Sequence, residues 1–222
     1  MPPTWRAMSF TTLDDLIARA RTRLDPVSGP VQLPEGGDLD FLSDAQIQAI
    51  RPAAVLVGLI PRADGPTALL TQRPDTMDKH PGQVAFPGGK VDPSDDDEVE
   101  AALREANEEV GVDPASVDLI ARGAPYITGT GFRVVPVLGL LPPDFQAVPC
   151  ETEVAAVFET PLDFLFNPEN HDRQTGNWRG KPRHYYQMPH GGFHIWGVTA
   201  GIIRALYLEL YGGDGDEPVR RT

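Results

Sequence analysis

Residues 89–112 read GKVDPSDDDEVEAALREANEEVGV, and this acidic stretch carries the strongest fold signal in the chain. Between positions 92 and 109 it holds nine acidic residues and one arginine, a net charge of −8 within a total of −13. At about 100° per residue, a helix over 95–110 places its apolar side chains on one stripe that must pack inward. That stripe consists of Val99, Ala102, Leu103, Ala106 and Val110.

Glutamates form a second stripe of the same helix. Glu98, Glu105 and Glu109 fall within about 40° of one another, and Glu108 lies beside them. Like charges three or four residues apart destabilise a helix by roughly 0.2–0.5 kcal/mol per pair, so these mid-helix glutamates indicate a compensating cation. A hard divalent ion suits them, because Mg²⁺ binds carboxylate oxygens together with substrate phosphates. The alternative, a solvated acidic face, is favoured for residues 95–97, since acids in a first turn complement the helix dipole.

Residues 104–112, REANEEVGV, resemble the second half of the Nudix box, Arg-Glu-aliphatic-any-Glu-Glu-any-Gly-aliphatic after a glycine and an acid. The resemblance implies an α/β fold, the Nudix-type α/β/α sandwich with a mixed sheet and a loop–helix–loop catalytic motif. It implies that Glu105, Glu108 and Glu109 are catalytic ligands of Mg²⁺ or Mn²⁺. Arg104 would orient a box carboxylate by a charge-assisted hydrogen bond. In such a site the metal neutralises phosphate oxygens and activates a water for pyrophosphate hydrolysis.

The first acid of the box departs from this pattern. Its usual distance from the glycine is one residue shorter than the distance from Gly89 to Asp96, and it is normally glutamate. Whether Asp96 fills this place stays open at this point.

A general base is also required. The segment CETEV, residues 150–154, offers Glu151 and Glu153, and the family often places a distal carboxylate there. We expect Glu153 to take the role; the alternative is that both are ordinary loop acids.

Four further segments resemble the coenzyme A pyrophosphatase branch of the Nudix family: LLTQR at 69–73, GQVAFPGG at 82–89, EVAAVFETPL at 153–162 and WGVTAGIIR at 196–204. The resemblance implies a nucleotide substrate, coenzyme A or an acyl derivative, cleaved to 3′,5′-ADP and 4′-phosphopantetheine. The residues expected to bind it are Arg73, Lys79, His80, Gln83, Phe86, Gly88 and Gly89.

The branch signature is incomplete, which keeps other substrates open. Pro74 replaces a small Ser or Ala, and Asp78 replaces an arginine that would hold phosphate. A nucleoside triphosphate, a dinucleotide or a nucleotide sugar is therefore the alternative. A non-catalytic nucleotide-binding module is a third hypothesis, against which the repelling glutamates argue. Residues 171–184 hold three more cations than acids, and could either cover an adenosine 3′-phosphate or form a plain polar loop.

Composition limits the remaining options. With 222 residues the chain can build one sizeable core. Its net charge of −13 argues against nucleic-acid binding, and no apolar run approaches the roughly 18 residues that a membrane span needs. A single cysteine, Cys150, excludes an intrachain disulfide and favours a cytoplasmic location. A homodimer is compatible with the family but is not indicated by any segment.

Periodicity and turn residues predict the remaining elements. The expected domains are an N-terminal helix and linker over 1–37, the Nudix hydrolase domain over 38–211 and a polar tail over 212–222. Helices are expected at 12–24, 44–50 and 198–211. Strands are expected at 53–60, 67–72, 84–86, 117–121, 134–141 and 153–158, with a hairpin of 185–188 and 193–196 and a loop over 171–184.

Overall fold

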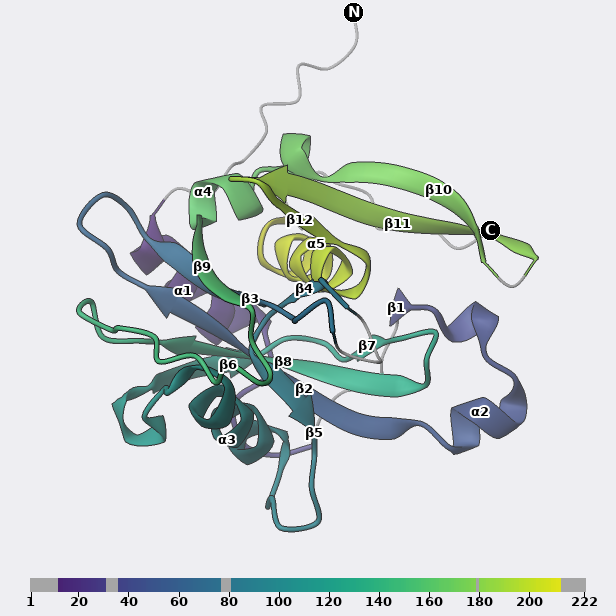
Figure 1. The fold of residues 1–222 in the computed structure, drawn as a ribbon, viewed down its shortest axis with the longest axis horizontal. Coiled ribbons are helices and arrows are strands. Elements are labelled where there is room, and N and C mark those ends of the chain that lie inside the picture. Colours follow the sequence, from purple (N-terminus) through teal and green to yellow (C-terminus); the bar gives the residue numbers. More distant parts are fainter. Residues whose placement is uncertain (1–11, 31–35, 77–80, 179, 213–222) are drawn as a thin grey trace, which may run out of the picture.

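The computed structural model describes residues 12–30, 36–76, 81–178 and 180–212, and its centre is a mixed nine-stranded sheet (Figure 1). The sheet follows the order β1-β7-β8-β2-β3-β4, with β5 paired to β2, β6 to β8 and β9 to β3. Its strands are β1 (Gly36–Gly37), β2 (Arg51–Ile60), β3 (Thr67–Gln72), β4 (Val84–Ala85), β5 (Gly88–Lys90), β6 (Asp118–Arg122), β7 (Tyr126–Ile127), β8 (Phe132–Leu140) and β9 (Ala156–Pro161). The parallel pairing of β2 with β8, beside antiparallel neighbours, makes the sheet mixed.

Helices cover both faces of this sheet (Figure 1). Side chains alternate along a strand, so that Ala53, Val57 and Leu59 of β2 enter the core under α5 while Ala54 and Leu56 enter the core under α3. The helices are α1 (Leu13–Arg23), α2 (Asp44–Gln48), α3 (Glu98–Val110), α4 (Leu162–Leu165) and α5 (Gly197–Tyr211). The predicted α/β/α sandwich with a mixed sheet is therefore confirmed. No helix of the described segments is long and apolar enough to cross a membrane.

The N-terminal helix joins the same core. Thr12 caps α1, accepting a hydrogen bond from the amide of Asp15. Leu16 and Ala20 are fully buried and belong to the core that α5 also supplies. The chain after α1 is tied to the sheet by a bridge between Asp25 and Arg122.

The acidic helix α3 starts and ends where its sequence favours it. Asp97 caps the first turn and accepts hydrogen bonds from the amides of Val99 and Glu100. Gly111 ends the helix in the left-handed region, at φ 72°, which glycine adopts without the steric cost of a side chain. The predicted helix is confirmed, with its first turn beginning at Glu98 rather than residue 95.

The prediction of a loop at residues 171–184 is wrong. A second, three-stranded antiparallel sheet lies there, made of β10 (Asp172–Trp178), β11 (Lys181–His190) and β12 (Phe193–Trp196). Its two long strands carry polar side chains on both faces, so they lack the alternation that marks a half-buried strand. The two strands are held by antiparallel pairing with each other along the whole length of β10, and the side-chain pattern does not predict this pairing.

Candidate active site

The site is built where α3 lies against the short strand β5. The amide of Gly88 donates a hydrogen bond of 3.2 Å to Oε2 of Glu109, whose residue is only 5% exposed. One residue further along β5, a Cβ atom on Gly89 would collide with the carboxylate of Glu105. The double glycine of the sequence thus lets two helix carboxylates approach the strand backbone closely.

Burial and mutual repulsion dominate the electrostatics of these carboxylates. Burial raises the pKa of Glu109 to about 7, opposed by the Gly88 amide and reinforced by the charge of Glu105. Burial also raises the pKa of Glu105, and Arg104 opposes that rise. The charge of Glu153 raises the pKa of both glutamates further. The site therefore concentrates negative charge in a place with little solvent to screen it.

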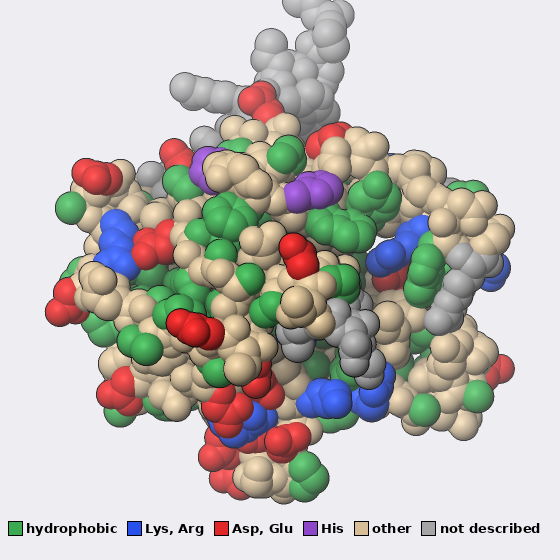
Figure 2. Space-filling view, in the orientation of Figure 1, with side chains coloured by type: hydrophobic (Ala, Val, Ile, Leu, Met, Phe, Trp, Pro, Cys, Tyr) green, Lys and Arg blue, Asp and Glu red, His purple; other side chains and the backbone are tan. Residues whose placement is uncertain are grey.

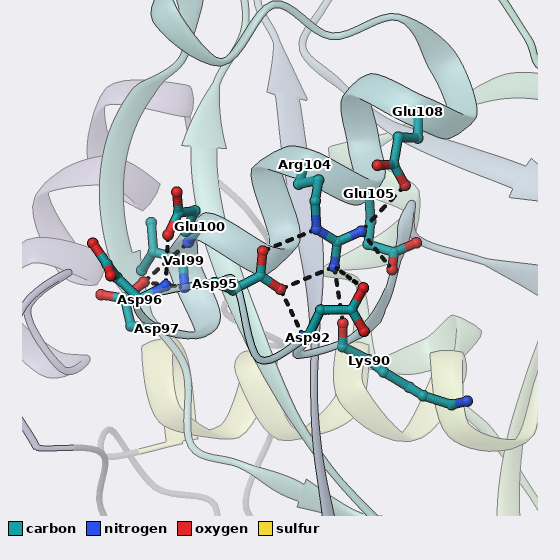
Figure 3. A network of polar contacts seen from close by, with 10 residues as sticks. All are labelled: Lys90, Asp92, Asp95, Asp96, Asp97, Val99, Glu100, Arg104, Glu105 and Glu108. Atoms are coloured by element: carbon teal, nitrogen blue, oxygen red, sulfur yellow. Dashed lines mark hydrogen bonds and ion pairs between the residues drawn. The ribbon is translucent and has the colours of Figure 1, made fainter.

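Arg104 organises the box, as Figure 3 shows. Its Nε and Nη2 each donate to Asp95 at 2.9 Å, and its Nη1 donates to Glu105 and Glu108 at 3.1 Å. Its Nη2 also donates to the carbonyl of Lys90, at the end of β5. One guanidinium thus joins the loop, the strand and the helix, and it bonds the carboxylates of Asp95, Glu105 and Glu108.

The structure places Asp95, rather than Asp96, in contact with Arg104. The Asp95 side chain is 2% exposed and its pKa is lowered by the hydrogen bonds from Arg104. Asp96 is exposed, and its backbone amide donates to Glu100 at 2.5 Å. The extra residue in the box is therefore accommodated after Asp95, which stands at the usual distance from Gly89.

Other predicted residues reach the site from neighbouring loops. The amide of Cys150 donates to the Glu109 carbonyl at 2.9 Å, which brings the turn holding Glu153 beside the two glutamates. Arg73 follows β3, donates its amide to the Gln83 carbonyl at 2.9 Å and lies close enough to lower the pKa of Glu109.

The remaining predicted residues are not gathered at the carboxylates. Phe86 is 3% exposed and packs in the core under α5, so its ring has almost no surface to offer a ligand. Lys79 and His80 lie outside the described residues.

The donors fit a hard divalent cation by their chemistry. Glu105 and Glu109 repel each other, and both have raised pKa values that a cation would lower. Within the described segments no three acidic, histidine or cysteine side chains converge as a ready ligand set. The Arg104 guanidinium, which bonds Glu105 and Glu108 together, accounts for part of this arrangement, since it occupies the space between the two carboxylates.

Comparison with known proteins shows the family to which the chain belongs. A family model described as the NUDIX domain matches residues 50–180, more than half of the sequence. The chain belongs to the Nudix family. It is 43% identical over 182 residues to a protein of Enterobacter sp. named uncharacterized Nudix hydrolase NudL, covering 77% of this chain and 93% of that protein. A protein of the same name from Cronobacter sakazakii is 44% identical over 168 residues, covering 76% and 85%.

A solved Nudix hydrolase from Alicyclobacillus acidocaldarius is also similar, at a TM-score of 0.49 and 21% identity, covering 73% of this chain and 94% of that one. Family membership makes the chain a Nudix hydrolase, which cleaves a pyrophosphate bond in a nucleotide derivative and depends on a divalent metal ion. Helix α3 accordingly carries the segment that resembles the Nudix box, with Glu105, Glu108 and Glu109.

Proposed function

We propose that this Nudix hydrolase cleaves coenzyme A or acyl-coenzyme A to 3′,5′-ADP and (acyl-)4′-phosphopantetheine, with Mg²⁺ or Mn²⁺. The observation that carries the proposal is the packing of Glu105 and Glu109 on Gly88 and Gly89. These glycines end the segment GQVAFPGG, which resembles the coenzyme A branch, so the branch-like segment and the family's metal helix form one site.

Each residue then has a distinct role in the proposed reaction. Glu105, Glu108 and Glu109 would hold the metal, which when bound neutralises phosphate oxygens and activates water. Glu153, beside Glu105 and Glu109, would accept the proton of that water. Arg73, close to Glu109, supplies positive charge for the diphosphate.

The remaining predicted residues are proposed to contact the substrate. The backbone of Gly88 and Gly89 allows close approach of the diphosphate, and Gln83 lies on the loop that Arg73 borders. Lys79 and His80 stay predictions from the resemblance. So do a cytoplasmic location, which the single Cys150 favours, and a homodimer, which size-exclusion chromatography with light scattering would detect.

The decisive test is product analysis. The purified protein is incubated with coenzyme A and Mg²⁺ or Mn²⁺, and 3′,5′-ADP is followed by chromatography. Glu109→Gln keeps the side-chain shape but removes the charge, so we expect kcat to fall at least about a hundredfold, as for loss of a group needed in the transition state. Undiminished activity in this variant would refute the metal assignment.

A second candidate substrate class follows from Pro74 and Asp78, which depart from the coenzyme A signature. A panel of nucleoside triphosphates, dinucleotides and nucleotide sugars, each at the same metal concentration, separates this candidate from the first. A higher kcat/KM for one of them than for coenzyme A would move the assignment to that class. The non-catalytic module gains no support, because the curated relatives are named hydrolases.

A further inference from the structure

Two cations beside the Nudix helix have no role in the reaction described so far. Lys90 ends β5, directly after the glycines that meet Glu105 and Glu109, and Arg51 begins β2. Figure 2 shows Lys and Arg side chains next to a cluster of acidic side chains in the lower part of the view. Both residues are exposed.

The strand register puts both side chains on one face of the sheet. Lys90 pairs with Ala53 in the antiparallel ladder of β2 and β5, so Arg51 is its diagonal neighbour. Diagonal neighbours of an antiparallel pair lie roughly 7–8 Å apart and point to the same side. Ala53 marks that side, because it enters the core under α5, opposite the face that α3 covers.

Unlike the other cations around the box, these two side chains have no acidic partner within residues 12–30, 36–76, 81–178 and 180–212. Arg104 is bonded to Asp95, Glu105 and Glu108, and Arg133 is bonded to Glu98 at 2.6 Å. Among the described residues, Lys90 has no side-chain hydrogen bond or ion pair, and its ammonium extends away from the network in Figure 3. Arg51 lies over the ring of Phe132, 3.9 Å from its centroid, and donates only a long bond to the Thr130 carbonyl.

Two like charges held on one face repel each other, and in a chain of net charge −13 acidic partners are plentiful. Because the described part of the chain supplies no acidic partner to either side chain, the pair is available to an anion. The stacking of Arg51 on Phe132 further fixes its guanidinium, and only one of its nitrogens donates a hydrogen bond within the described residues, which suits planar recognition of a phosphate.

The position of β5 connects this pair with the hydrolytic site. In the described sheet β5 pairs only with β2, and the Gly88 amide and the Lys90 carbonyl are bonded to the side chains of Glu109 and Arg104. The Nudix glutamates lie over one face of β5 and Lys90 over the other. Since no second strand pairs with β5 in the described sheet, a ligand that passes around it can place its diphosphate at Glu105 and Glu109 and a second phosphate at Lys90 and Arg51.

We propose that Lys90 and Arg51 bind a phosphate monoester of the substrate that is not hydrolysed, and so select nucleotides that carry a phosphate in addition to the diphosphate. The inference rests on the proposed function, in which that group is the 3′-phosphate of coenzyme A. In this proposal the 3′-phosphate lies beside the start of β2 and the end of β5. Of the cationic residues considered for the same role from sequence, Arg173 lies on β10 and Lys181 and Arg183 lie on β11, where Arg183 is already bonded to Asp38 at 2.6 Å.

The test compares ligands that differ only in this phosphate. Hydrolysis of coenzyme A and of 3′-dephospho-coenzyme A is measured for the wild type, Lys90→Gln and Arg51→Gln. We expect the wild type to favour coenzyme A in kcat/KM by about tenfold or more, as for one charge-assisted contact. Each variant should lose most of this preference while keeping its activity on the dephospho compound, and Arg51→Lys should retain part of it.

Lys181→Gln is the matched control, because it removes one exposed positive charge from β11. A shift of the preference in this variant, with none in Lys90→Gln, would place the phosphate on the hairpin and overturn the inference. An equal loss on both substrates would also overturn it, because Lys90 would then serve the diphosphate itself.

Binding of the products separates the two proposals. Calorimetry with 3′,5′-ADP and 5′-AMP reports on the phosphate site without turnover. Preferential binding of 3′,5′-ADP that Lys90→Gln abolishes supports the inference even if coenzyme A is not hydrolysed, in which case the proposed function alone fails. Equal affinity of the wild type for both nucleotides would refute the inference alone.

Discussion

Among single residues, Arg104 has the largest influence on the arrangement of the Nudix box. Its guanidinium holds Asp95 in the loop before the helix and Glu105 and Glu108 on the helix. These contacts raise the pKa of Arg104 well above its usual range, chiefly through the hydrogen bonds to Asp95. Asp95 therefore anchors the group that positions two predicted metal ligands, although it would contact neither metal nor substrate.

Substitution of Asp95 tests this chain of contacts. We expect Asp95→Asn to lower the free energy of unfolding by about 1–3 kcal/mol, because hydrogen bonds to a charged, buried carboxylate are lost. It should also lower kcat by about tenfold or more, since Arg104 would be free to move with Glu105. Urea unfolding and steady-state kinetics measure the two effects.

Asp96→Asn is the matched control, because Asp96 is exposed and engages Glu100 through its backbone alone. A surface change of this kind stays within about 0.5 kcal/mol. If Asp96→Asn were the more damaging substitution, Asp96 and not Asp95 would be the first acid of the box.

At the scale of elements, an ion pair joins the β10–β11 hairpin to Asp38, the residue that follows β1. Arg183 on β11 donates to both carboxylate oxygens of Asp38, at 2.8 and 2.6 Å, and Asp38 is 4% exposed. The amide of Gly129 donates to the same carboxylate at 3.0 Å. Trp178 on β10 lies beside this pair, with the Arg183 guanidinium 5.0 Å from its ring centroid.

Removal of the cation should destabilise the fold more than its partial exposure suggests. Arg183→Gln leaves Asp38 buried without its counterion, a change that typically costs about 3–5 kcal/mol. Lys181→Gln, on the same strand, should change the free energy of unfolding by less than about 0.5 kcal/mol. Chemical denaturation of the two variants checks this prediction, and similar midpoints would show that the hairpin is held by its other contacts.

The hairpin also shows where sequence-based prediction ends. Helix α3 and strands β2 and β3 follow from periodicity, because each has an apolar face to bury. The helical repeat likewise predicts that Glu105 and Glu109 lie together. By contrast, polar β10 and β11 have no such signal, and their order depends on partners such as Asp38, 145 residues before Arg183.

Contacts between distant segments account for the rest of the site. The sequence leaves open whether Asp96 is the first acid of the box, and the contact with Arg104 favours Asp95 instead. The approach of Glu153 depends on a backbone hydrogen bond from Cys150 to Glu109. The pairing of Lys90 with Ala53 depends on the register between β2 and β5, and the sequence of neither strand alone predicts that register.

For the whole molecule, three separate parts of the chain meet at Glu209 on α5. Its Oε2 accepts a hydrogen bond of 3.1 Å from the amide of Ala124, between β6 and β7. Its Oε1 is buried and has no hydrogen-bond partner in the described part of the chain. Asp25, just after α1, adds a like charge. Burial is the main cause that raises the pKa of Glu209 from its reference value of 4.5 to about 7.

This shift makes stability depend on pH in a defined direction. Because the folded-state pKa is the higher one, the folded protein binds the proton more tightly, and the resulting stabilisation is complete below about pH 4.5 and lost as pH rises through 7. The wild type should therefore lose about 2–3 kcal/mol more than Glu209→Gln between pH 5 and pH 8, at 1.36 kcal/mol per pKa unit. The pKa values of Glu105 and Glu109 are also raised, but both residues are present in the wild type and in the variant. Their contributions to the pH dependence of stability therefore cancel in the difference. Urea unfolding of the two proteins at several pH values measures that difference, and parallel stability curves would mean that the Glu209 carboxyl is hydrated in the folded state.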